Sequence, residues 1–450
     1  MAPIENDPEA PVVAGGPARD AAVDLTASAV VEVPPELVAQ TLGQYLRGWW
    51  LRVRNGDSGV LPVVVGIVGI AIVFQVLNSR FLEPLNLVNL FSQSSIYMVL
   101  AMAEIFILLL GEIDLSIGYV AMFGGVVTWK LVQAPSPGWP WWLAILTALL
   151  CCALVGAIQG SLVSRLKIPS FVVTLGGLLL FRGIVHIVLG GADGLASISP
   201  SVPNQAPIYN LVQGNIDPVA SWVVMAVVVA VAGGFLWLRG SARRRSGLVA
   251  APSSVTALRI ALLAAVAIAV VAICNVNRGV SIEVDGVPVV VPVVLALLAA
   301  WTLLLQRTRY GRYVYAVGGN PEAARRAGVK LPAVRTWAFV LSAVTAGIAG
   351  ILLGSFFYGQ YSTNEADGGQ LVLYAVAAAV IGGTSLFGGR GKTIHGVLGG
   401  LIIGGIVYGM ALLGLHVEWE LIVTGGVLLV AVLIDVLSRR GASKGNTDRA

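Results

Sequence analysis

Long apolar runs alternate with short polar stretches along this chain, and the polar stretches are rich in arginine and lysine. A helix that crosses a lipid bilayer needs about 20 mostly apolar residues. Runs of that length predict twelve membrane-spanning helices, at residues 59–78, 91–110, 115–132, 140–164, 171–190, 219–238, 256–274, 287–306, 336–358, 371–387, 396–415 and 419–437. We therefore expect an all-α integral membrane protein, a polytopic bundle of about 10–12 transmembrane helices in the lipid bilayer.

The flanks of this apolar region differ from it in composition. Residues 1–45 are rich in Pro, Ala, Val and acids, so we expect a disordered cytoplasmic N-terminal tail. Within 35–54, aromatic and leucine residues mix with arginines, which is typical of a helix lying in the membrane interface. The transmembrane domain is expected to cover 46–440, with a large cytoplasmic loop at 307–335, and 441–450 to form a cytoplasmic C-terminal tail.

The basic residues predict the orientation. If there are twelve spans, most of the arginines and lysines between them fall on one side of the membrane, including the groups at 47–54, 165–167, 239–245, 307–335 and 439–444. Lys and Arg concentrate in cytoplasmic loops, so both termini are predicted to be cytoplasmic in a plasma (inner) membrane protein. A re-entrant hairpin at 111–118 would change the number of spans without moving the termini.

Composition excludes several classes of protein. Hydrophobic residues make up 57% of the chain and charged residues 11%, whereas soluble domains carry about 25% charged residues. The net charge of +5 does not suggest a nucleic-acid partner, because no soluble basic domain is present. The three cysteines and three histidines have no metal-site spacing. We expect no catalytic residue, metal site or cofactor.

One segment of the large cytoplasmic loop has strong helix-end signals. Asn320 is a good N-cap, Pro321 suits the first helical position, Glu322 favours the positive end of the helix, and Gly328 suits the left-handed position beyond it. The residues between them are Ala323, Ala324, Arg325, Arg326 and Ala327. Small alanines let such a helix enter a groove on a partner, where the arginines can pair with acids. The alternative is a linker helix bound to lipid headgroups.

Four segments resemble one known family. The pattern from Glu322 to Gly328 is similar to the EAA–G pattern of ABC importer permeases. Gly111–Gly118 (GEIDLSIG), Ile168–Leu175 with Phe181–Gly183, and Ile381–Gly389 (IGGTSLFGG) resemble signatures of the ribose/xylose/arabinose/galactose permease family, and Glu112 resembles the D-xylose branch. The resemblance implies two copies of the permease, a separate ABC ATPase subunit that receives the 320–328 helix, and an extracytoplasmic sugar-binding protein. The implied activity is import of a monosaccharide, D-xylose or a related pentose, by alternating access.

Two of these signatures also suggest an internal repeat. Leu110–Gly118 can be laid over Ile381–Gly389, and each segment follows a span entering the cytoplasm. This arrangement predicts a parallel repeat of the kind that places a pathway between two halves. Alternatively, the glycines in both segments simply end helices.

Polar groups inside the predicted membrane region are further candidates. Glu104 and Arg182 fall midway along spans; Glu112, Asp114 and Ser116 lie in the polar turn of the first signature; and Thr384 and Ser385 lie in the last. Unpaired charges at the bilayer centre cost at least about 2.5–3.5 kcal/mol. One hypothesis pairs Arg182 with Glu104, Glu112 or Asp114, clamping the second and fifth spans together. The other places these groups along the sugar pathway.

Other readings of the sequence stay open. Gly388–Thr393 ends like a phosphate-binding P-loop, but Leu386 stands where the motif needs its first glycine, so we expect no ATP binding by this chain. An ion-coupled secondary transporter would use Glu104, Asp114 and Arg182 as a relay. A permease for branched-chain amino acids or nucleosides, or a channel or scaffold protein, would be the remaining alternatives.

Overall fold

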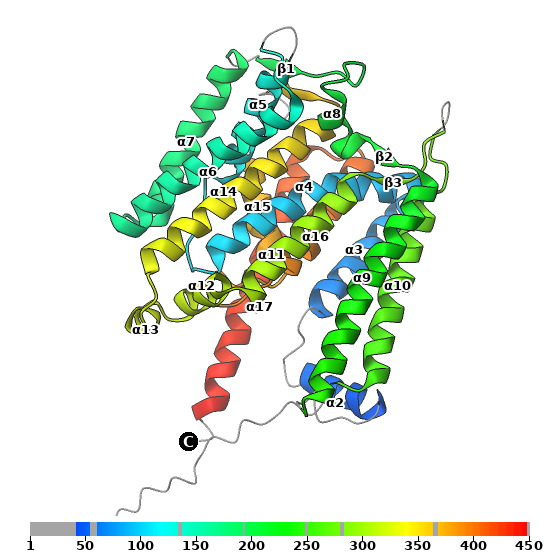
Figure 1. Cartoon of the computed structure of the whole chain (residues 1–450), viewed down its shortest axis with the longest axis vertical. Helices are drawn as coiled ribbons and strands as arrows, with labels where there is room; N and C mark the ends of the chain where they lie inside the picture. The colour runs from blue at the N-terminus through cyan, green and yellow to red at the C-terminus, as the bar shows by residue number, and fades with distance from the viewer. Residues whose placement is uncertain are drawn as a thin grey trace, which may run out of the picture.

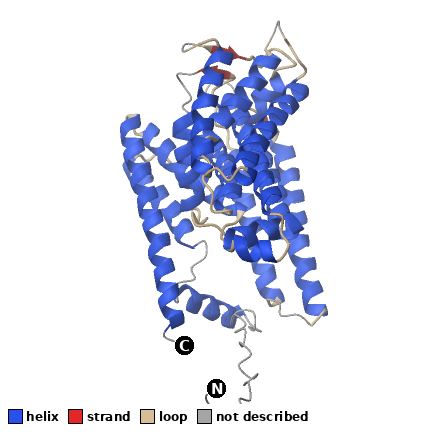
Figure 2. Ribbon diagram, turned by 90° about the vertical axis from the view of Figure 1, so that its left-hand side faces the viewer, coloured by secondary structure: helices blue, strands red, loops and turns tan. Residues whose placement is uncertain are grey.

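The protein is a bundle of helices (Figures 1 and 2). The computed structural model describes residues 42–447 except 55–60, 134–136, 192–193, 248–250, 280–282 and 363–367. Most of the expected N-terminal tail therefore lies outside the described residues. The long or apolar helices are α3 (Leu61–Leu77), α4 (Pro84–Leu108), α5 (Ile117–Val132), α6 (Trp141–Arg165), α7 (Ser170–Leu189), α9 (Pro218–Arg245), α10 (Ser253–Cys274), α11 (Val290–Arg307), α14 (Leu331–Phe356), α15 (Gly368–Ile381), α16 (Thr393–Leu412) and α17 (Val417–Thr447).

Each predicted span corresponds to one of these helices, which confirms the all-α membrane class. Within the described part of the chain, eight helices are long and apolar enough to cross a membrane, and α3, α5 and α15 are shorter apolar helices. Several boundaries were wrong: α9 ends at Arg245 rather than 238, α14 begins at Leu331 rather than 336, and α17 ends at Thr447 rather than 437. Helix α4 begins at Pro84 rather than 91, because proline suits the first helical turn. Helix α15 ends at Ile381 rather than 387, because glycines and polar residues follow it.

Helix α4 lies at the centre of the bundle. Its residues from Ser94 to Leu108 are all buried, and it packs against α14, α15 and α16. Gly396, Gly400 and Gly404 of α16 lie against this helix, where an added Cβ at Gly400 would come within 2.5 Å of the Met98 nitrogen. The four-residue spacing of these glycines therefore permits close backbone contact between helices.

The helix packing has the form expected for a parallel internal repeat. The pairs α4–α5 and α15–α16 each descend to one end of the bundle, turn and return (Figure 1). Helix α14 precedes α15 and packs on α5, just as α3 precedes α4 and packs on α16. The predicted residue-by-residue alignment of the two turns was wrong, because the turns differ in length: the first covers 109–116 and the second 382–392.

The short elements lie at the two ends of the bundle. Strands β1 (Leu195–Ser197) and β4 (Gln360–Ser362) pair antiparallel, as do β2 (Asn215–Ile216) and β3 (Val287–Pro288), near α8 (Ala206–Gln213). Figure 2 shows the strands at the end opposite the C terminus. At the other end lie α12 (Arg309–Gly319), α13 (Pro321–Arg326) and α2 (Leu42–Arg54). Helix α2 starts before the expected boundary at 45, and α17 continues through 441–447.

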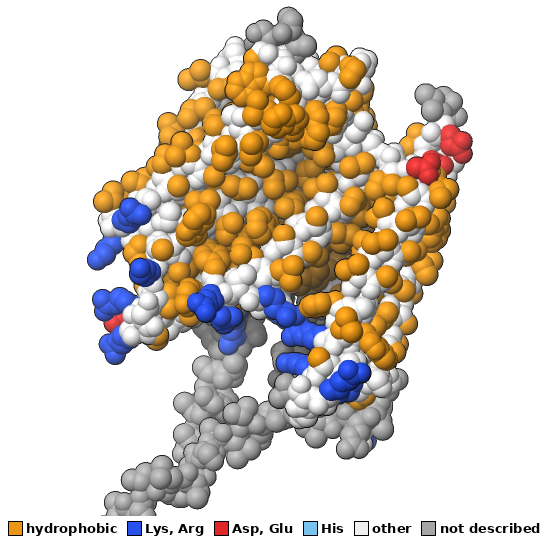
Figure 3. Space-filling view, in the orientation of Figure 1, with side chains coloured by type: hydrophobic (Ala, Val, Ile, Leu, Met, Phe, Trp, Pro, Cys, Tyr) orange, Lys and Arg blue, Asp and Glu red, His pale blue; other side chains and the backbone are white. Residues whose placement is uncertain are grey.

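Charge is distributed unequally between these ends. Figure 3 shows Lys and Arg side chains gathered along the end that carries α12 and α13, while apolar side chains cover the flanks. The apolar flanks are suited to contact lipid acyl chains.

Candidate functional site

Helices α12 and α13 are placed by side chains that cap their first turns. Thr308 Oγ1 accepts a hydrogen bond from the Gly311 nitrogen at 3.2 Å, and Asn320 Oδ1 accepts one from the Ala323 nitrogen at 3.0 Å. Gly328 has a φ of +83° and its nitrogen donates to the Arg325 carbonyl, which closes α13. The helix ends predicted from the sequence are therefore present, with α13 at Pro321–Arg326.

The surface of α13 is open to solvent. Ala324 is its buried residue, whereas Pro321, Glu322, Ala323, Arg325 and Arg326 are exposed. The Glu322 carboxylate accepts hydrogen bonds from Arg325, with an ion-pair distance of 2.8 Å, and from Arg326 at 3.2 Å. These hydrogen bonds lower the pKa of Glu322. The short helix thus carries its charges in a fixed arrangement beyond the bundle (Figure 1).

Helix α12 contacts both transmembrane turns at once. The Gly389 nitrogen donates a hydrogen bond to the Leu109 carbonyl at 2.9 Å, which joins the two turns. A Cβ on Gly318 of α12 would lie 1.7 Å from the Leu109 oxygen and 2.7 Å from the Gly389 nitrogen. We call this contact among Leu109, Gly318, Gly388 and Gly389 the glycine junction. It connects the loop that carries α13 to both halves of the repeat.

The second turn is shaped by its own polar groups. The Ser385 hydroxyl accepts a hydrogen bond from the Phe387 nitrogen at 3.1 Å, and the Ser385 nitrogen donates to the Arg390 carbonyl. Thr384 is buried, and its hydroxyl has no hydrogen-bond partner among the described residues. Tyr315 of α12 donates to the Gly391 carbonyl at 2.8 Å. Thr384 and Ser385 therefore belong to a turn held against α12.

The first turn is held by α6 and α7. Asp114 accepts hydrogen bonds from the Ser116 nitrogen at 2.8 Å and hydroxyl at 2.6 Å, and Gln159 of α6 donates to that hydroxyl at 2.9 Å. From α7, the Ser170 hydroxyl accepts a hydrogen bond from the Ile113 nitrogen, and Thr174 donates to the Ile113 carbonyl. The first two sequence signatures therefore fold against each other. The turn joins helix α4 to helix α5.

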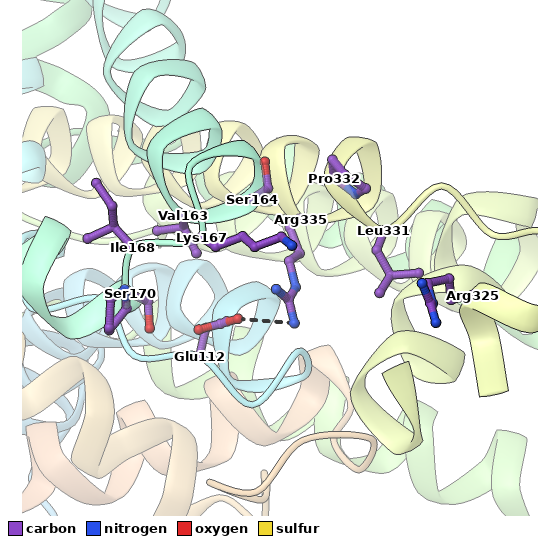
Figure 4. Close-up of a pocket in the computed structure, with 11 residues that line it drawn as sticks. Glu112, Val163, Ser164, Lys167, Ile168, Ser170, Arg325, Leu331, Pro332 and Arg335 are labelled. Carbon is purple, nitrogen blue, oxygen red and sulfur yellow. Dashed lines mark ion pairs between the residues drawn. The ribbon is translucent and has the colours of Figure 1, made fainter. Parts of the chain in front are cut away.

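Glu112 lies in a basic pocket beside α13. Its carboxylate is 3.5 Å from the Arg335 guanidinium of α14. The pocket has a volume of about 420 Å³, and Lys167, Ser170 and Arg325 also line it. Figure 4 shows Lys167 and Arg335 extending into the same space, with the ion pair at its base. This ion pair links the first turn to the helix that follows α13.

The predicted clamp between Arg182 and an acid is not formed. Glu112 pairs with Arg335, and Asp114 accepts hydrogen bonds from Ser116. Glu104 is completely buried in α4, and its carboxyl oxygens have no hydrogen-bond partner among the described residues. Arg182 is instead exposed on the outer face of α7. The prediction was wrong because depth along a helix does not fix the direction in which a side chain points.

Several residues of the site were missed by the sequence reasoning. They are Gly318 and Tyr315 of α12, Gln159 of α6, and Arg335. The Gly318–Gly319 pair in a helix beside the Asn320 cap was the available signal, because glycine inside a helix commonly marks close backbone approach.

Comparison with known proteins identifies the family. The family model described as "Branched-chain amino acid transport system / permease component" matches residues 86–432. The xylose transport system permease protein XylH of Escherichia coli (strain K12) is 32% identical, over 87% of this chain and 95% of its own. The D-allose transport system permease protein AlsC of the same strain is 29% identical, over 85% of this chain and 92% of its own length. The ribose import permease protein RbsC of Bacillus subtilis (strain 168) is 29% identical, over 85% of this chain and 94% of its own length.

No solved structure matches this chain. The family match covers more than half of the chain, and the xylose permease aligns with nearly all of it. The aligned region includes the glycine junction, α13 and the basic pocket. This multi-pass membrane protein therefore belongs to the family of branched-chain amino acid transport system permease components, together with sugar transport permeases.

Proposed function

We propose that this chain is the permease subunit of an ATP-driven importer that moves a monosaccharide, D-xylose or a related pentose, into the cytoplasm by alternating access. The observation that carries the proposal is the glycine junction. Helix α12 touches the turn of each half of the repeat, and the exposed helix α13 follows it directly. A force applied to α13 from outside the bundle has a short, closely packed route to both halves.

The ATPase is a separate subunit in this proposal. It binds α13 from the cytoplasm through the exposed arginines, and ATP-driven closure displaces α12. The gathering of basic residues at the α13 end supports a cytoplasmic position for that end and for both termini. A sugar-binding protein delivers substrate at the opposite end, where α8 and the short strands lie. Two permease copies form the pathway.

The choice of pentose is supported by the relatives. The xylose permease has 32% identity to this chain, and the allose and ribose permeases have 29%. Few polar side chains are available in the apolar helices to bind sugar tightly. Affinity and selectivity therefore fall mainly to the external binding protein.

Reconstitution in proteoliposomes tests the proposal. The chain is combined with an ABC ATPase subunit and a sugar-binding protein, and uptake of labelled D-xylose is measured with and without ATP. Excess unlabelled D-xylose, ribose, allose or leucine is added as a competitor in parallel samples. We expect uptake that needs ATP and both partners, and that xylose inhibits most strongly. Uptake that an ionophore abolishes, or that proceeds without the ATPase, would refute the proposal. If leucine were the one competitor that inhibits, the proposed substrate would be wrong and a branched-chain amino acid would take its place.

A further inference from the structure

Helices α9 and α10 form a hairpin at the edge of the molecule. The two helices pack mainly against each other, and α10 also contacts α4 and β3. A small apolar cluster makes this contact near the C-terminal end of α10; it contains Val88, Val271, Cys274 and Val287. Figure 3 shows that the surface is hollowed between the hairpin and the rest of the bundle, with apolar side chains on its walls and Lys and Arg at the end near α12.

Two exposed apolar faces line this hollow. The Arg307 guanidinium carbon lies 5.2 Å from the centre of the Phe235 ring, so these sides of α11 and α9 are turned toward each other. At 100° per residue, Val228 and Val231 share the Phe235 side of α9, and Leu303 shares the Arg307 side of α11. Val228, Val231 and Leu303 are 39%, 68% and 53% exposed. We call the space between these two faces the hairpin groove.

Three arginines lie at one end of the hairpin groove. Arg239 and Arg243 are one turn apart near the end of α9, and Arg307 is the last residue of α11. All three are exposed, and Arg239 lies close enough to the other two to be repelled by both. No acid in the described ranges forms an ion pair with any of them, and the stretch 218–282 contains no Asp or Glu. The protein therefore gathers positive charge here without neutralising it.

We propose that the hairpin groove binds an anionic phospholipid, with the phosphate among Arg239, Arg243 and Arg307 and the acyl chains along the apolar faces. Guanidinium groups bind phosphate oxygens through paired N–H donors. Basic sites between membrane helices are suited to anionic headgroups. One phosphate offsets the repulsion among the three arginines. This site is separate from the glycine junction, and the inference does not rest on the proposed function.

The chemistry of the groove favours this occupant over three others. A second copy placed here by two-fold symmetry would bring two sets of three arginines together. A soluble phosphate has no acyl chains to cover the apolar faces. Phosphatidylcholine carries a positive choline group, which the arginines repel. An anionic phospholipid matches both the charged end and the apolar walls.

Lipid titration of the purified full-length chain tests the headgroup contacts. Its Tm in detergent is measured as phosphatidylglycerol, phosphatidylcholine or glycerol phosphate is added. We expect phosphatidylglycerol to raise the Tm at a concentration at least tenfold lower than either of the others, and added salt to weaken its effect. In Arg239→Gln/Arg307→Gln, the phosphatidylglycerol concentration that gives half of the shift should rise about 10- to 30-fold.

A second pair of basic residues provides the matched control. Arg165 ends α6 and Lys167 follows it, and both are exposed. Arg165→Gln/Lys167→Gln removes the same charge and should respond to phosphatidylglycerol as the wild type does. Equal responses to phosphatidylglycerol and phosphatidylcholine, or an unchanged response of Arg239→Gln/Arg307→Gln, would overturn the proposal. An equal response to glycerol phosphate would also overturn it, because the site would then bind a soluble phosphate.

Fluorescence quenching tests the acyl chains independently of the arginine variants. Cys151→Ser removes the native cysteine that is not buried. Val231→Cys, about 12 Å along α9 from Arg239, then carries a fluorescent thiol label in bilayers that contain brominated lipid. Ala269→Cys is the control, since Ala269 is exposed on the side of α10 opposite Ile260, which faces α9.

The two labelled positions should respond differently to the headgroup. At Val231→Cys, half-maximal quenching should need at least fivefold less brominated phosphatidylglycerol than brominated phosphatidylcholine, whereas Ala269→Cys should show no preference. The same preference at both positions, or none at Val231→Cys, would remove the lipid from the groove. Covalent dimers formed through unlabelled Val231→Cys on oxidation would place a second copy there instead and overturn the proposal.

Discussion

Replacing Gly318 with alanine tests the mechanical role of the glycine junction. The added Cβ would lie 1.7 Å from the Leu109 oxygen, 2.9 Å from the Leu109 carbonyl carbon and 2.7 Å from the Gly389 nitrogen. Ordinary contacts between carbon and its neighbours begin near 3.5 Å, so α12 must move away from the first turn by about 1.5 Å or more. All three close atoms belong to the backbone, so no side-chain rotation relieves the overlap.

The expected magnitude follows from the cost of overpacking. Extra methyl groups in closely packed regions cost about 1–3 kcal/mol, and each 1.4 kcal/mol changes an equilibrium tenfold. The state in which α12 seats against both turns should therefore be about 5- to 150-fold less populated. We expect the number of sugar molecules moved per ATP to fall accordingly, while the ATPase continues to hydrolyse ATP.

A neighbouring residue provides the matched control. Gly319 follows Gly318 and is the last residue of α12, but an added Cβ there would meet nothing within 4 Å. Both variants are compared in proteoliposomes for sugar uptake, ATP hydrolysis and Tm. Gly318→Ala should lose coupling while Gly319→Ala retains it. If the two variants give the same ratio of sugar to ATP, the junction does not transmit motion.

The other predictions concern the parts beside the junction. Gly328→Val forces a branched side chain into a φ of +83° and should uncouple transport from ATP hydrolysis. Gly247→Val, at a φ of +66° in another loop with equally open space, is the control and should leave coupling unchanged. The ratio of sugar uptake to ATP hydrolysis is measured for both variants, and equal ratios would contradict the prediction. Glu112→Gln and Arg335→Gln should each lower the free energy of unfolding, and a double-mutant cycle should give a coupling of about 0.5–1 kcal/mol, whereas additive effects would mean the pair is not stabilising. Since hydrogen bonds from two arginines lower the pKa of Glu322 from 4.5, its stabilising effect should persist at pH 6–8 and be lost only as pH falls through that lowered pKa. Amide-exchange protection of α13 should thus be constant over pH 6–8 and lower in Glu322→Gln.

Local features of the chain were predictable because they depend on neighbouring residues. The length of each apolar run fixes where a membrane helix can form, and all twelve predicted spans contain a helix. The Asn320 cap and the left-handed Gly328 were also predictable, since each satisfies backbone groups within a few residues.

Features that depend on the rotation and packing of helices were not predictable. Glu104 and Arg182 both lie within spans, but one points into the centre of the bundle and the other away from it. Glu112 found its partner in Arg335, which lies far along the chain and becomes a neighbour only when α14 packs beside the first turn. The sequence specifies the depth of a charge in the membrane, whereas its partner is specified by the fold.

The glycine junction also limits how the two halves can move. The turns at 109–116 and 382–392 are joined by a direct backbone hydrogen bond, and both touch α12. A displacement of α12 therefore acts on α4 and α5 together with α15 and α16, rather than on one half first. Because α4 is buried and packed against α14, α15 and α16, the movement must pass through the bundle as shifts of whole helices. In the proposed mechanism, a short helix at one end thus changes the access of a pathway whose other end is a full bilayer away.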